Sequence, residues 1–276
     1  MKRETIRKLL TTGLLACAAS SSQAAIDAWG YTVDMKWTDA VFSQSTNINS
    51  STKFTDTLLS WGYSGGLDDF VLNGSNPYYA RSSLKITTPH GAGVISTGSS
   101  VSQVNIFRHT NNEIDASFAD LKEATLSVSV NLTAYGSPVP VETLNKNFKV
   151  FFYETPNTGG TCAWGFCNDD IFAFVAMPQI YDEFVYGGNT YRFKYFQTSG
   201  PDAITEFSAD ICSAMSGGLL TTSCYGFKTL ESAQTVLQFG FSVSAVPEPE
   251  TYAMLLAGLS LVGAAARRRQ RGVPRH

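Results

Sequence analysis

The sequence has little of what most often marks a chemical site. Its 276 residues include three histidines and five cysteines, and no two cysteines stand in the C-x-x-C spacing that is typical of a zinc site. The spacing of an EF-hand calcium loop is also absent. Long helix-forming runs are few, and charged residues make up only 16% of the chain. These absences argue against a thiolate zinc site, an EF-hand and a helical fold.

The residues that are plentiful favour an all-β fold. The chain has 18 Phe and 12 Tyr, together with many Ser, Thr and Gly. Apolar and polar side chains alternate over residues 124–134, which predicts a strand with one buried face. The alternation recurs in three further segments, 148–152, 191–195 and 237–243, and Gly187-Gly188-Asn189 predicts a hairpin turn. Many short antiparallel strands predict a single β-sandwich, jelly-roll-like, over residues 25–245.

The N-terminal segment has the pattern of a cleaved signal peptide over residues 1–24. Basic residues at 2–8 precede an apolar stretch at 9–19, and Ser22-Gln23-Ala24 resembles a cleavage site. One alternative stays open. Residues 14–17, which end at Cys17, resemble a lipobox, and cleavage there would leave a lipidated cysteine at the N-terminus.

The C-terminal segment, residues 246–276, has the pattern of a membrane anchor. Pro247, Glu248 and Pro249 precede an apolar run at 252–266, and a basic cluster follows it: Arg267, Arg268 and Arg269. Fifteen helical residues span about 22 Å, less than the roughly 30 Å hydrocarbon core of a bilayer. We therefore expect one short transmembrane helix that holds the protein in the membrane transiently, with the arginines on the cytoplasmic side.

The order of these three parts resembles the PEP-CTERM sorting signal. The resemblance implies a partner, an exosortase-type membrane protease that cuts near the Pro-Glu-Pro. It also implies that the protein is exported, is briefly anchored in the inner membrane, and then reaches the cell surface or the extracellular (biofilm) matrix of a Gram-negative bacterium.

The charge of the segment between the two signals limits its partners. Residues 26–245 contain eleven Lys and Arg against twenty Asp and Glu, a net charge of −9. An acidic body repels phosphate backbones and anionic lipid surfaces, so we expect no nucleic-acid partner and no membrane contact beyond the C-terminal helix. An extracellular polysaccharide remains as a possible partner.

Four cysteines lie in the body of the chain, at 162, 167, 212 and 224. In an exported protein, an even set predicts two disulfides. Among the three connectivities, Cys162–Cys167 with Cys212–Cys224 closes the shortest loops, and we expect this one. Four thiolates binding a metal are the rival, which the spacing and the oxidising compartment disfavour.

A second resemblance covers most of the body. Four blocks carry it: Ser51–Thr57 with Leu59–Gly62, His109–Ile114, Phe151–Thr155 and Cys167–Phe172. These blocks resemble the THxN family of PEP-CTERM proteins, although Arg108 stands where the family has its threonine. The resemblance implies a shared fold unit and sorting route, and it implies no activity.

Three residues are candidates for ligand binding. His109 and Asn111 would share one face of a strand and could bind a sugar hydroxyl or a cation. The alternative, which we favour, is a structural role in which His109 bonds to the backbone. Trp164 could stack on a sugar, and packing in the core is the alternative for that ring.

Asp169 and Asp170 are candidates for a Ca²⁺ site, because oxygen-rich loops of secreted β proteins bind this ion. Neighbouring aspartates on a strand point to opposite faces, so this pair cannot chelate by itself. Turn-forming aspartates are the alternative. We expect no other cofactor.

These observations predict an exported protein of the cell surface or extracellular matrix, with a structural or glycan-binding role and no enzymatic activity. The alternative is a secreted carbohydrate-active enzyme, which would need two carboxylates in one cleft.

Overall fold

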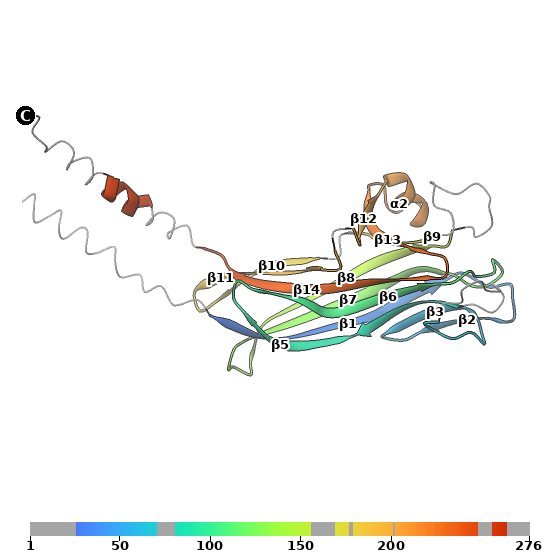
Figure 1. Cartoon of the computed structure of the whole chain (residues 1–276), viewed down its shortest axis with the longest axis horizontal. Helices are drawn as coiled ribbons and strands as arrows, with labels where there is room; N and C mark the ends of the chain where they lie inside the picture. Colours follow the sequence, from blue (N-terminus) through green and yellow to red (C-terminus); the bar gives the residue numbers. More distant parts are fainter. Residues whose placement is uncertain are drawn as a thin grey trace, which may run out of the picture.

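A computed structural model describes residues 26–70, 81–155, 169–176, 179–200, 202–247 and 256–263. Within these residues, fourteen strands form two seven-stranded sheets, which we call sheet A and sheet B. Every strand pairing is antiparallel. Figure 1 shows long strands running along the longest axis of the molecule. The prediction of an all-β fold is confirmed.

Sheet A has the strand order β12-β13-β9-β8-β7-β1-β5. Its strands are β1 (Ala28–Phe42), β5 (His90–Ser96), β7 (Leu121–Ala134), β8 (Pro140–Tyr153), β9 (Asp169–Phe174), β12 (Thr205–Phe207) and β13 (Cys224–Leu230). Sheet B has the order β10-β11-β14-β6-β4-β3-β2. Its strands are β2 (Ser50–Phe54), β3 (Leu58–Tyr63), β4 (Arg81–Thr88), β6 (Ser100–Asn111), β10 (Ile180–Tyr186), β11 (Asn189–Gln197) and β14 (Ala233–Ala245).

The strands with the clearest alternation bury one face. In β7 every second side chain from Ala124 to Ala134 is buried, as the sequence predicts. In β11 three aromatic rings are buried while Arg192 and Lys194 between them are exposed. The hairpin between β10 and β11 turns at Gly187 and Gly188, whose φ angles of 57° and 77° suit glycine.

The main core lies between the inner faces of the two sheets and is rich in aromatic rings. Trp29, Trp37 and Trp61 are all at most 1% exposed. Trp61 meets Phe152 of sheet A edge to face, with ring centroids 4.9 Å apart. These three tryptophans therefore pack the interior, which stabilises the sandwich through a large apolar area and preferred ring geometry.

A second, smaller core lies on the outer face of sheet A. The helix α2 (Ala209–Met215) covers β13 and β9 there (Figure 1). Its buried side chains, Ile211, Cys212 and Met215, belong to one apolar cluster with Phe151 and Ile171. A disulfide joins Cys212 to Cys224 at the start of β13, which confirms that predicted bridge. The predicted bridge between residues 162 and 167 lies outside the described residues.

The last strand leads towards the C-terminus from within sheet B. β14 ends at Ala245, and the backbone N–H of Val246 still donates to Thr190 O at 2.8 Å. Residues 256–263 are helical, and their side chains are exposed. Across the described residues, no helix is long and apolar enough to cross a membrane.

Candidate functional site

Three strands of sheet A bring a row of polar side chains into the interior. The pairing of β8 with β9 ends at Tyr153 and Ile171, and the same register places Glu154 opposite Asp170. Asp170 pairs in turn with Thr229 on β13. The preceding inward row consists of three phenylalanines of the main core, Phe152, Phe172 and Phe227. Glu154, Asp170 and Thr229 therefore continue the inner face of the sheet with polar groups.

Two residues of β6 reach this row from sheet B. His109 Nδ1 lies 2.8 Å from Thr229 Oγ1, and Asn111 Nδ2 donates to Thr229 O at 2.9 Å. Both side chains are completely buried. We call His109, Asn111, Glu154, Asp170 and Thr229 the interior cluster. The two candidate ligand residues of β6 thus share one face of a strand and lie in the interior.

The hydrogen bonds around His109 indicate its tautomer. Thr235 Oγ1 donates to Lys228 O, and Thr229 Oγ1 donates to Thr235 Oγ1 at 2.8 Å. Thr229 Oγ1 has then used its proton, so His109 Nδ1–H must be the donor to it. Burial lowers the pKa of His109 to about 3, so the ring is neutral at ordinary pH. The ring stacks on Trp61 with centroids 6.3 Å apart.

The two carboxyl groups of the interior cluster have no positive partner. Burial raises the pKa of Glu154 well above its usual value, and the charges of Asp170 and Glu231 raise it further. Burial followed by the charge of Glu231 likewise raises the pKa of Asp170. A backbone hydrogen bond from Thr155 opposes this shift and acts to lower the pKa of Asp170. Among the described residues, no salt bridge reaches Glu154 or Asp170.

Asp169 belongs to a different environment from its neighbour. It points to the opposite face of β9, where Lys228 Nζ lies 2.9 Å from its Oδ2. Asp169 and Asp170 therefore cannot ligate the same cation through their side chains.

Glu231, in the turn between β13 and β14, has a pKa raised to about 7 by burial and by the nearby Glu113.

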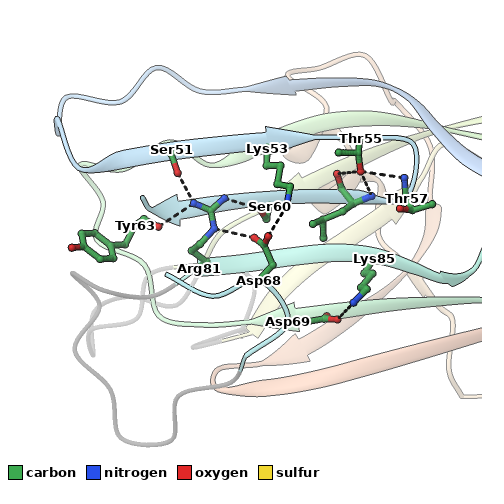
Figure 2. Close-up of polar contacts among 11 residues, drawn as sticks. Ser51, Lys53, Thr55, Thr57, Ser60, Tyr63, Asp68, Asp69, Arg81 and Lys85 are labelled. Atoms are coloured by element: carbon green, nitrogen blue, oxygen red, sulfur yellow. Dashed lines mark hydrogen bonds and ion pairs between the residues drawn. The ribbon is translucent and has the colours of Figure 1, made fainter. Parts of the chain in front are cut away.

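A second polar cluster, which we call the arginine cluster, lies where β2, β3 and β4 meet (Figure 2). Arg81 is 5% exposed, and its Nε bonds to Asp68 Oδ1 at 3.1 Å. Its Nη1 donates to Ser51 Oγ and to the backbone O of Tyr63, and its Nη2 donates to Ser60 Oγ. These residues and Lys53 form the cluster. Each guanidinium nitrogen has at least one acceptor.

The acids at this end of sheet B are neutralised by nearby cations. Lys53 Nζ lies 3.1 Å from Asp68 Oδ2, and Lys85 Nζ lies 2.6 Å from Asp69 Oδ2. Burial alone would raise the pKa of Asp68, but hydrogen bonds from Ser60 and Lys53 and the charge of Arg81 outweigh it and lower the pKa. This cluster is complete within the chain, as expected of a structural network.

A surface cavity of about 540 Å³ opens beside α2, and we call it the α2 pocket. Its lining residues are Asp202, Ala203, Thr205, Glu206, Phe207, Ser208, Ile211, Phe227, Lys228 and Thr235. Phe207 and Phe227 are 3% exposed and give it an apolar base. Asp202 and Glu206 supply exposed carboxylates. The volume falls in the range of small-ligand sites, and the mixed lining suits a polyhydroxylated ligand.

The α2 pocket and the interior cluster are in contact. Thr235 lines the pocket and accepts the hydrogen bond from Thr229, the residue that holds His109. Phe227 lines the pocket and meets the His109 ring edge to face, with centroids 6.0 Å apart. A change at the pocket wall therefore has a short route to the buried histidine.

Several predicted site residues lie outside the described residues: Cys162, Trp164, Cys167, Glu248, Pro249, Arg267, Arg268 and Arg269. Their proposed roles stay predictions. Pro247 is described and exposed, two residues after the end of β14.

Glu154 and the α2 pocket were missed by reasoning from the sequence. The signal for Glu154 was present, since the inward alternation of Val150 and Phe152 continues to it. A carboxylate at an inward position of a strand indicates a special environment. The α2 pocket had no such signal, because its walls come from β12, β13, β14 and α2.

The described residues thus define an all-β protein with two antiparallel sheets and one disulfide. The family model of the PEP-CTERM protein-sorting motif matches residues 245–269, which begin at the last residue of β14. The chain thus carries a PEP-CTERM sorting motif, which indicates an exported protein that is sorted by an exosortase, a membrane protein. No curated protein matches the chain.

Proposed function

We propose that this PEP-CTERM protein is a non-catalytic component of the cell surface or extracellular matrix of a Gram-negative bacterium, and that it binds polysaccharide through the α2 pocket. The observation that carries the proposal is the composition of this pocket. Carboxylates and hydroxyls at its rim can bond to sugar hydroxyls, and apolar rings at its base can contact sugar carbon atoms.

The pocket is held in place by elements of different kinds, which favours a preformed site. The disulfide from Cys212 to Cys224 fixes α2 to β13, and Ile211 of α2 lines the pocket. Preformed walls reduce the entropy lost on binding, so a modest contact area is sufficient for useful affinity.

Membership of the THxN family is part of the proposal. The blocks that carry this resemblance lie far apart in the sequence, and each contributes one residue to a single region: Trp61, His109, Glu154 and Asp170. Blocks that meet in space support a shared fold unit more strongly than blocks that remain scattered.

Glycan binding is tested with the purified full chain on an array of bacterial polysaccharides, followed by calorimetry with the best ligand. Glu206→Gln should weaken binding by about tenfold, the value of roughly one charge-assisted hydrogen bond. Asp210→Asn is the matched control, since this exposed acid lies on α2 without lining the pocket. Equal binding by the wild type and Glu206→Gln would contradict the assignment of the pocket.

A secreted carbohydrate-active enzyme is the second candidate, because Asp202 and Glu206 lie in the same pocket. Paired carboxylates are the usual machinery of glycoside hydrolysis. The glycans that bind are incubated with the protein, and the release of new reducing ends is measured. Our proposal predicts no release, whereas release that Glu206→Gln abolishes would establish the enzyme.

The sorting route is tested by deleting residues 252–276. This deletion should abolish the processed, surface-associated form while export through the N-terminal signal continues. Cell fractionation and the mass of the mature protein report the result. Unchanged fractionation and mass would contradict sorting through this segment.

A further inference from the structure

We propose that Glu154, Asp170 and Asn111 form a buried binding site for one calcium ion. The site lies between the ends of β8, β9 and β6, and none of its three residues lines the α2 pocket, so the proposal does not depend on glycan binding. It differs from the pair suggested by the sequence, since Asp169 points away from it to Lys228.

The register of the strands brings the two carboxyl groups together. Glu154 and Asp170 occupy opposite positions on neighbouring antiparallel strands and face the same side of sheet A. Such positions have Cα atoms about 4.5–5.5 Å apart, which lets two carboxylates reach a common ion.

The carboxyl groups of Glu154 and Asp170 lack a compensating positive charge among the described residues. The carboxyl oxygens of both residues are buried, and apart from the backbone N–H of Thr155 and the contact between the two carboxyl groups themselves, they have no hydrogen-bond partner among the described residues. No lysine or arginine within that part of the chain forms an ion pair with them. Two buried carboxylates in this situation must either hold a proton or bind a cation, because uncompensated burial of charge is very costly.

Asn111 gives an independent reason to choose the cation. Its Nδ2 faces Thr229 O, which can only accept a hydrogen bond, so the orientation of the amide is fixed. Its Oδ1 is therefore turned away from Thr229 O, and Thr229 is the residue that pairs with Asp170 on the neighbouring strand. This oxygen is completely buried and has no hydrogen-bond partner among the described residues. A shared proton would leave this acceptor unsatisfied, whereas a metal ion would use it.

The donor set matches calcium better than zinc or magnesium. All the donors are oxygens, and two bidentate carboxylates with one amide oxygen supply five of the about 6–8 ligands that Ca²⁺ takes. Water can complete the shell. The two negative charges balance one divalent ion. The described residues hold no group of three His, Cys, Asp or Glu side chains suited to a metal, so this site depends on its amide.

The test is thermal unfolding of the purified full chain after treatment with a chelator. Adding Ca²⁺ at about a hundredfold excess over its Kd should raise Tm by roughly 5–10 °C, and Mg²⁺ should raise it far less. Calorimetry should find one Ca²⁺ per chain. Wild-type protein that shows no Ca²⁺ shift would overturn the proposal and favour a shared proton.

Variants of the proposed ligands show whether a Ca²⁺ shift in Tm comes from this site. Asp170→Asn, and separately Glu154→Gln, should abolish the Ca²⁺ shift and raise Tm in chelator, since each removes one of two buried acids that lack a counter-charge while keeping the shape of the side chain. Asp169→Asn, one residue away on the opposite face, should retain the full shift. A Ca²⁺ shift that persists in Asp170→Asn and Glu154→Gln would place the ion elsewhere and overturn the site.

Discussion

The arginine cluster and the interior cluster both contain acidic side chains, but only in the arginine cluster do basic side chains pair with them. In the arginine cluster, Asp68 meets Arg81 and Lys53, and every guanidinium nitrogen has an acceptor. In the interior cluster, Asp170 meets Glu154 and no cation of the described chain. Asn112, next to Asn111, connects the two regions, because its Nδ2 donates to Arg81 O at 2.7 Å.

The charges of the arginine cluster are balanced within the chain, whereas the carboxyl groups of the interior cluster lack a counter-charge among the described residues. A buried arginine with all its acceptors in place fixes the geometry of three strands. Two buried carboxylates without a counter-charge destabilise the fold unless a proton or a cation joins them. The first region is therefore structural, and the second is the place to look for a ligand.

The largest effect should come from removing the centre of the arginine cluster. Arg81→Leu leaves Asp68 and the hydroxyl groups of Ser51 and Ser60 without their donor, and we expect a loss of about 3–5 kcal/mol of unfolding free energy. Urea denaturation measures it. A loss below about 1 kcal/mol would show that this network does not hold the strands together.

The disulfide includes no residue of either cluster, so its removal should affect only the packing of α2. Replacing Cys212 and Cys224 together by Ala should cost about 2–4 kcal/mol. It should also weaken glycan binding at the α2 pocket, measured by calorimetry, while leaving the Ca²⁺ shift in Tm unchanged. Loss of that shift in the double variant would mean that the two regions are coupled.

His109 should make the interior cluster sensitive to acid. The folded protein holds this ring neutral with a pKa of about 3, whereas the unfolded chain takes up a proton near pH 6.5. The unfolded state thus binds more protons between these values, so stability falls as pH decreases below about 6.5. A cation bound nearby would lower the pKa of His109 further, so stability would still fall as the pH decreases.

The effect is measured as the difference between the wild type and His109→Gln, in which the contributions of the carboxyl groups largely cancel. Between pH 7 and pH 4 the wild type should lose about 2–3 kcal/mol more than the variant. Parallel pH profiles for the two proteins would contradict a neutral, buried His109.

The smallest effect is expected at the exposed rim of the arginine cluster. Lys53 is 49% exposed, and its ion pair with Asp68 is screened by solvent. Lys53→Gln should therefore change the unfolding free energy by only about 0–1 kcal/mol, measured by the same urea titration. A loss as large as that of Arg81→Leu would mean that charge near Asp68, rather than the hydrogen bonds of Arg81, stabilises this end of the sheet.

Much of the fold could be predicted because its signals are local. The alternation in β7, β11 and β14 depends on neighbouring residues, and so does the glycine turn after β10. The pairing of Cys212 with Cys224 followed from a short spacing in an exported chain. The opposite directions of Asp169 and Asp170 followed from the pleat of a strand.

The sites depend on contacts that no local pattern contains. Glu154 meets Asp170 through the register of β8 and β9, and Asn111 reaches Thr229 across the space between the sheets. Arg81, at the start of β4, meets Asp68, which lies in the connection between β3 and β4 and not on a strand. These contacts follow from the register of the strands, the path of a loop and the stacking of the sheets. His109 and Asn111 could therefore be chosen from the sequence, but their surroundings could not.

The most direct test compares the same substitution in both clusters. Asp68→Asn and Asp170→Asn are made separately, and the unfolding free energy is measured by urea titration in the presence of a chelator. Asp68→Asn should lose about 1–2 kcal/mol, because it weakens hydrogen bonds to charged partners. Asp170→Asn should gain stability, because it removes an uncompensated buried charge. Opposite signs are the predicted result. A loss of stability in both variants would contradict the account, since it would mean that Asp170 is already balanced within the chain.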